Sequence, residues 1–250
     1  MASKKKSKAV IDMSFFDHLD ELRKRFIYIA IVVIIATVIS FSFVDQLLAI
    51  LTGQADNLDL IYTTPAEAFM SQIRLSFIAG VLITLPFTLY NLLAFIMPAL
   101  RKAEKKSVIL LVFFMVFLFF LGVSFGFFVV FPYALNFFLG FATDGLLPLF
   151  TISRYISFVV SFLVGFGVVF QVPLVFWFLG RFSIVSSTFL RTNRKYALLI
   201  IAILSAVITP PDIFSQVLMV GPMMVLYEIG VLLVRLTERK RAKMEQADEA

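Results

Sequence analysis

The stretch HLDELRKR, residues 18 to 25, places two carboxylates among basic side chains directly before a long apolar run. A carboxylate can bind a guanidinium group with two oxygens, because the planar fork of arginine presents parallel N–H donors. Asp20 and Lys24 are four residues apart, as are Glu21 and Arg25, so a helix would pair each acid with a base on its own surface. The stretch therefore permits two interpretations: ordinary surface ion pairs, or an acid that meets a cationic partner.

Few other side chains could support catalysis. His18 is the only histidine, cysteine is absent, and no GxxxxGK[ST] phosphate loop occurs. A multi-histidine metal site, a thiolate nucleophile and nucleotide hydrolysis each need residues that the sequence lacks. We therefore predict that the chain is not an enzyme and holds no metal and no cofactor.

Two polar residues lie within apolar runs. Gln171 follows FGVVF, and Glu228 lies in the last apolar run. Such groups are costly in lipid and usually face a bundle interior or a cavity. Hydrogen bonding between helices explains them as well as a functional role does. We expect Glu228 to have a structural or partner-docking role near Gln171.

The composition indicates the elements that position these residues. Of the 250 residues, 61% are hydrophobic and 15% are charged, whereas about a quarter are charged in a soluble domain. Several apolar runs have the length of about 20 residues that a helix needs to cross a bilayer. They lack the two-residue alternation of barrel strands. We predict an all-α integral membrane protein.

We expect one membrane domain over residues 1–250 with six transmembrane helices. A cytoplasmic amphipathic segment, residues 1–25, would lie along the membrane surface, and a charged tail would follow from 236 to 250. Pro86 should kink the second span. The basic start MASKKKSK does not resemble a cleavable signal peptide, because its apolar run is too long. The six spans are 26–44, 69–97, 107–131, 154–179, 196–210 and 213–235.

The fifth span is short. At 1.5 Å per residue it rises only about 22 Å, below the hydrocarbon thickness of about 30 Å. Pro210, Pro211 and Asp212 should force a tight break before the sixth span. Either this hairpin lies toward one surface of the membrane, or the bilayer thins around it.

Basic residues indicate the orientation. Seven precede the first span, four lie in each of the second and fourth loops, and five lie in the tail. Only Arg74 and Arg154 fall on the other side, near the starts of spans two and four. The positive-inside rule then places both termini in the cytoplasm. The net charge of +6 follows this topology and does not indicate nucleic acid.

Several motifs together resemble the TatC family, the polytopic core of the twin-arginine protein translocase. The first is HLDELRKR itself. The resemblance extends over nearly the whole chain and keeps the family's order of motifs. The further motifs are AFIMPALRKAEKK (94–106), FGFFVVFPYAL (125–135), FGVVFQVP (166–173), TPPDIFSQ (209–216) and YEIGV (227–231).

The resemblance implies a binding site for signal peptides that carry two consecutive arginines. In the family, two glutamates receive the arginine pair, and they correspond here to Glu21 and Glu104. Phe95 and Pro98 match positions that shape the floor of the site, and Arg23 matches a position that orients the first glutamate. Many members carry Glu where this sequence has Gln171, so a titrating carboxylate is missing at that position.

The resemblance also implies the number of helices, the cellular location, the partners and the energy source. TatC proteins have six helices with a short fifth and sixth, and they lie in the bacterial cytoplasmic membrane. They export folded proteins with small single-span subunits of the TatA and TatB type, in a complex that can contain several copies. The proton gradient drives this export, and no nucleic acid takes part.

Two other classes of membrane protein remain open from the residues alone. A secondary transporter of a small solute would use Glu228 and Gln171 at a midplane site, but no inverted repeat relates the two halves. An insertase would need a hydrophilic groove with a buried cation.

Overall fold

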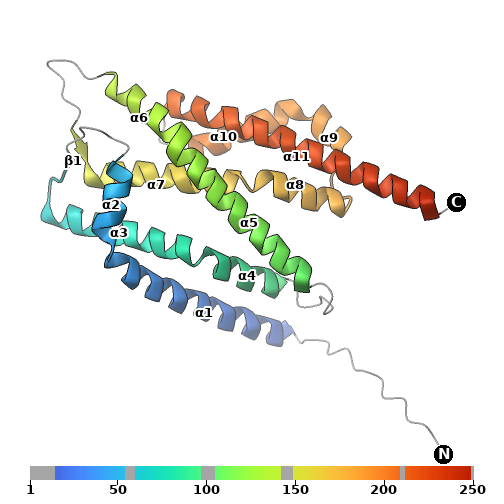
Figure 1. The fold of residues 1–250 in the computed structure, drawn as a ribbon, viewed down its shortest axis with the longest axis horizontal. Helices are drawn as coiled ribbons and strands as arrows, with labels where there is room; N and C mark the ends of the chain where they lie inside the picture. The colour runs from blue at the N-terminus through green and yellow to red at the C-terminus, as the bar shows by residue number, and fades with distance from the viewer. Residues whose placement is uncertain (1–14, 54–59, 97–104, 142–148, 209–211, 249–250) are drawn as a thin grey trace, which may run out of the picture.

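The computed structural model describes residues 15–53, 60–96, 105–141, 149–208 and 212–248. Six helical segments form an elongated bundle (Figure 1). Five helices in the described residues are long and apolar enough to cross a membrane. In chain order the segments are α1 (Phe15–Phe41), α3 with α4 (Pro65–Ile83, Leu85–Ile96), α5 with π-helix η1 and α6 (Lys105–Phe125, Gly126–Val130, Phe131–Leu139), α7 with α8 (Ile152–Val169, Val172–Arg181), α10 (Arg194–Ile208) and α11 (Ile213–Asp248).

Short elements connect these segments at the two ends of the bundle. Helix α9 (Ser187–Thr192) precedes α10, and helix α2 (Val44–Thr52) follows α1. Strand β1 (Leu60–Ile61) pairs in parallel with β2 (Phe150–Thr151). The strands therefore join the connection before α3 to the connection before α7, at the end of the bundle away from the start of α1 (Figure 1).

Prolines set the helix breaks. Proline has no N–H and cannot bond to the carbonyl four residues back. The second span divides between Ile83 and Leu85, just before Pro86, as we predicted. The π-helix η1 lies just before Pro132, and two residues separate α7 from α8, which contains Pro173. Helix α11 continues through Pro222, so a proline within a span does not always divide the helix.

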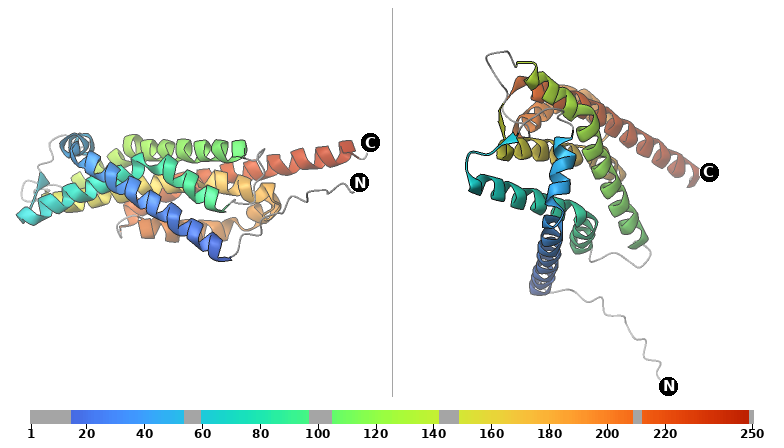
Figure 2. Two further views of the ribbon diagram at one scale, coloured as in Figure 1. Left: turned by 90° about the horizontal axis from the view of Figure 1, so that it is seen from below. Right: turned by 60° about the vertical axis from the view of Figure 1, so that its left-hand side comes forward.

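The last two segments differ in length. Helix α10 has 15 residues, so the fifth span is short, as predicted. The sixth helix is longer than predicted, because α11 has 36 residues and continues through the charged tail. Residues 236–248 contain no glycine or proline and are rich in helix-forming side chains. The tail therefore extends α11 beyond the other helices (Figure 2).

The segment that we predicted to lie along the membrane surface, residues 1–25, is described only from Phe15. A separate surface helix would require a bend before the first span. Helix α1 instead runs unbroken from Phe15 to Phe41. No glycine or proline interrupts this stretch, so nothing in the local sequence favours a bend. The carboxylates of HLDELRKR thus lie in the first turns of the helix that forms the first span.

Helix α7 forms the centre of the bundle. Its residues Ile156, Phe162 and Phe166 are fully buried, and it contacts both α3 and α5. Helix α1 lies outside α3, where a Cβ added to Gly80 would lie only 2.7 Å from the backbone nitrogen of Thr37. This glycine lets the two backbones approach closely, as small residues do between membrane helices.

Candidate binding site at the start of the first helix

Helix α1 begins beside the end of α4 (Figure 1). Both predicted surface pairs form in its first turns. The Lys24 ammonium lies 2.7 Å from the Asp20 carboxylate, and Arg25 lies 2.6 Å from Glu21. The environments of the pairs differ, because the side chains of Glu21 and Arg25 are each 25% exposed whereas that of Asp20 is 52% exposed. Glu21 is therefore the acid that α1 turns toward its neighbours.

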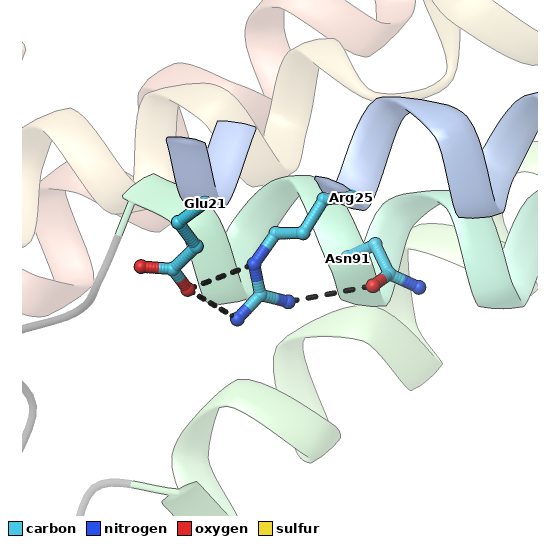
Figure 3. Close-up of polar contacts among 3 residues, drawn as sticks. All are labelled: Glu21, Arg25 and Asn91. Atoms are coloured by element: carbon cyan, nitrogen blue, oxygen red, sulfur yellow. Dashed lines mark hydrogen bonds and ion pairs between the residues drawn. The ribbon is translucent and has the colours of Figure 1, made fainter. Parts of the chain in front are cut away.

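A hydrogen-bonded group of three residues joins α1 to α4 (Figure 3). Arg25 Nε and Nη2 both donate to Glu21 Oε1, at 2.9 and 2.6 Å. Arg25 Nη1 donates to Asn91 Oδ1 at 3.3 Å. Asn91 Nδ2 donates in turn to the carbonyl oxygen of Phe87 at 2.9 Å. This last bond turns the amide oxygen of Asn91 toward the guanidinium.

The carboxylate of Glu21 keeps capacity for a second cation. A carboxylate has about four lone-pair sites on its two oxygens. Arg25 occupies Oε1 only, and Oε2 accepts no hydrogen bond from any residue that the structure describes. The site therefore has an acid that already binds one guanidinium and has an oxygen left for another.

The family resemblance led us to expect that Arg23 orients Glu21. In the structure, Arg23 makes no hydrogen bond or ion pair with Glu21. Arg25 makes that contact, whereas Arg23 is exposed and forms no ion pair within the described residues. The reason is helix geometry: residues four apart share a face, and residues two apart do not.

The other predicted site residues lie near the same end of the bundle or outside the description. Glu104 and Pro98 lie outside the described residues. Phe95 is half-buried in the last turn of α4, four residues after Asn91 and on the same helical face. The start of α5, at Lys105, lies at this end too (Figure 1).

Sequence analysis missed Asn91. Its signal was a single amide in the apolar stretch LYNLLAF. A polar side chain within a span usually has a partner, and here the partner is a residue of another helix. Asn91 is 8% exposed, so it belongs to the contact between α1 and α4.

We expected Glu228 to lie near Gln171, but the two side chains have different hydrogen-bond partners. Gln171 Nε2 donates to the carbonyl oxygens of Met115 at 3.1 Å and Gly167 at 3.3 Å. The carboxylate of Glu228 accepts from Arg194 at 2.7 Å. The partner differs because Arg194 is the first residue of α10, which packs against α11.

The predicted break before α11 is described only in part. Pro210 and Pro211 lie outside the described residues. Asp212 Oδ1 accepts the backbone N–H of Ser215 at 2.7 Å, so Asp212 caps the first turn of α11. Within the described residues, no group of three or more histidine, cysteine or acidic residues could hold a metal ion.

Comparisons with known proteins agree with the fold and with the ordered motifs. The family model for the Sec-independent protein translocase protein (TatC) matches residues 17–222. The chain belongs to the TatC family. It is therefore a membrane-embedded component of the Tat protein translocase, and not the solute transporter or the insertase that the residues alone left open.

Curated TatC relatives match over most of the chain. The protein TatC of Carboxydothermus hydrogenoformans is 38% identical over 237 residues, which cover 94% of this chain and 98% of the relative. TatCy of Bacillus subtilis is 32% identical over 245 residues, covering 96% and 95%. A crystal structure described as the twin arginine translocase receptor TatC has 36% identity, a TM-score of 0.75, and coverage of 88% of this chain and 99% of that chain.

Proposed function

We propose that this TatC-family chain is the receptor for twin-arginine signal peptides, and that Glu21 receives one of the two arginines. The observation that carries the proposal is the Glu21 carboxylate, which binds the guanidinium of Arg25 through Oε1 and keeps Oε2 available. A solved relative is described as a twin arginine translocase receptor, which supports the same function.

Two arginines need two separate acids. In an extended peptide, successive side chains point to opposite sides, so neighbouring arginines cannot share one carboxylate. We infer that Glu104 receives the second arginine. Its neighbour Lys105 begins α5, at the same end of the bundle as the start of α1 (Figure 1). This placement supports a site formed between α1, α4 and α5.

We also propose the orientation of the chain in the membrane, its partner subunits and its energy source. The basic segments should place both termini in the cytoplasm, so that the site faces newly made proteins. Small single-span subunits of the TatA and TatB type would assemble with the chain to export folded proteins. The proton gradient would supply the energy.

Binding of a twin-arginine peptide to membranes that contain the full chain tests the site. A hydrogen bond to a charged group contributes roughly 1.5–3 kcal/mol, so Glu21→Gln should weaken binding about 10- to 100-fold. Asp20→Asn is the matched control, because it removes the same charge one residue away, and it should leave binding unchanged. A twin-lysine peptide should bind weakly to every variant. Loss of binding in Asp20→Asn with normal binding in Glu21→Gln would refute the assignment.

A further inference from the structure

Arg74 and Arg154 are the two basic residues that do not belong to the predicted cytoplasmic segments. They fall on the opposite side of the predicted topology. The structure places Arg74 farther from the start of its helix than the sequence predicted. Helix α3 begins at Pro65, so Arg74 lies about 14 Å along its axis. Arg154 is the third residue of α7. A cation at such depth in a span is costly and usually marks a site with a counter-charge.

One pocket is lined by Arg154 of α7, and Arg74 of α3 contacts a serine of the same pocket. Arg154 lines an open pocket of about 380 Å³ with the hydroxyl-bearing Ser153, Ser157 and Ser161 of α7. Arg74 does not line the pocket, but its Nη1 donates to Oγ of Ser157, which does. Ser157 directs its own proton to the carbonyl oxygen of Ser153 at 2.6 Å. Its lone pairs are thereby left to accept from arginine.

Neither arginine forms an ion pair with a carboxylate in the described residues. A guanidinium has five N–H donors, and the bond to Ser157 uses one of those of Arg74. The acid nearest in sequence, Glu67, lies about two turns, or 10 Å, before Arg74 on α3. Its carboxylate accepts the N–H and the hydroxyl of Thr63 at 2.9 and 2.7 Å, and it also lies near the backbone of Ser153, which lines the pocket. Two arginines thus face one acid, which leaves a net positive charge and unused donors.

Apolar side chains surround this charge. Ile73 and Phe77, on either side of Arg74 in sequence, are exposed, and Val207 of α10 lines the pocket while 77% exposed. An occupant that matches both features has an anionic head and an apolar body. Phosphate oxygens suit the head, because arginine and hydroxyl donors bind them well.

We propose that the pocket lined by Arg154, together with the neighbouring Arg74, binds the phosphate headgroup of an anionic membrane lipid, whose chains lie against the exposed apolar faces of α3 and α10. The pocket lies at the end of the bundle opposite Glu21, so this inference does not depend on the proposed receptor function. With both termini in the cytoplasm, the lipid would belong to the outer leaflet.

Native mass spectrometry of the full chain tests the proposal, after purification from nanodiscs that contain phosphatidylglycerol and phosphatidylcholine. The wild-type chain should retain one phosphatidylglycerol per protomer. The double variant Arg74→Gln/Arg154→Gln should retain it at least about tenfold less. The control Arg239→Gln/Lys240→Gln loses the same charge from the exposed tail helix and should behave like the wild type.

Each alternative result overturns the proposal. Equal retention by the double variant would show that the arginines do not hold the lipid. Equal retention of phosphatidylcholine would show that anionic lipid is not selected. Displacement of the lipid by millimolar inorganic phosphate would identify a free-phosphate site instead. If the double variant does not fold, the single variant Arg154→Gln decides, because exposed Arg154 has no hydrogen-bond or ion-pair partner in the described chain.

Discussion

At the scale of single residues, Arg25 already binds the carboxylate of Glu21, which we propose to receive an arginine of the signal peptide. Its guanidinium donates twice to one oxygen of Glu21 and once to Asn91. An incoming arginine must therefore either share the carboxylate through Oε2 or displace Arg25 from Oε1. In both cases a second positive charge lies close by, and it weakens the attraction.

Removal of this internal competitor should strengthen peptide binding. We expect Arg25→Gln to bind a twin-arginine peptide about two- to fivefold more tightly, because a partly exposed ion pair contributes at most about 1 kcal/mol. Binding titrations at constant ionic strength measure this change. Lys24→Gln removes the same charge from the Asp20 pair and should have little effect. Weaker binding by Arg25→Gln would mean that Arg25 positions Glu21 and does not compete with the ligand.

At the scale of helices, contacts between neighbours depend on single small or polar residues. Gly80 allows α1 to approach α3, since its added Cβ would lie 2.7 Å from the Thr37 backbone. Glu238 of α11 accepts the N–H and the hydroxyl of Ser187. It thereby binds the first turn of α9, a helix of six residues.

Substitution of Gly80 by alanine should destabilise the contact between α1 and α3. Backbone atoms cannot move away cheaply, and overpacking costs roughly 1–3 kcal/mol. Thermal unfolding in detergent should show a lower midpoint for Gly80→Ala. Gly221→Ala serves as the control, because a Cβ at that position meets no atom within 4 Å. An unchanged midpoint for Gly80→Ala would show that α1 shifts on α3 without cost.

Loss of the Glu238 carboxylate should loosen α9. Without this acceptor, the N–H of Ser187 loses its partner at the helix start, and a helix of six residues has little stability alone. Hydrogen–deuterium exchange should therefore accelerate in residues 187–192 of Glu238→Ala. Exposed Lys240→Gln, on the same helix, should leave that exchange unchanged. Equal exchange in both variants would mean that α9 is held by its apolar contacts.

At the scale of the whole molecule, sequence analysis predicted the helical class and the short fifth span, because hydropathy and length report directly on burial in lipid. The Asp20 and Glu21 pairs were also predictable, since helical spacing alone brings their partners close. The hydrogen bond from Arg25 to Asn91 was not predictable, because the two residues are 66 positions apart in the sequence. The length of α11 was missed because hydropathy marks the membrane boundary, whereas the helix continues through polar residues that favour helix.

The orientation of the bundle can be tested directly, because the chain has no cysteine. We predict that Arg191→Cys, at the end of the bundle that holds the start of α1, reacts with an impermeant thiol reagent only after the membrane is permeabilised. Tyr62 lies just after β1 and is 62% exposed. The variant Tyr62→Cys should therefore react in intact cells. The reverse pattern would place both termini outside.

The close approach of Gly80 and Thr37 divides α1 into two unequal arms. Helix α1 has 27 residues and no internal break, so it behaves as a rigid rod of about 40 Å. Glu21 lies about 24 Å from Thr37 along the axis, and Phe41 lies about 6 Å beyond it on the other side. If the rod tilts about this fulcrum, a movement of about 4 Å at Glu21 becomes an opposite movement of about 1 Å at Phe41. Capture of a ligand at one end of the bundle would thus be transmitted, reduced about fourfold, to α2 at the other.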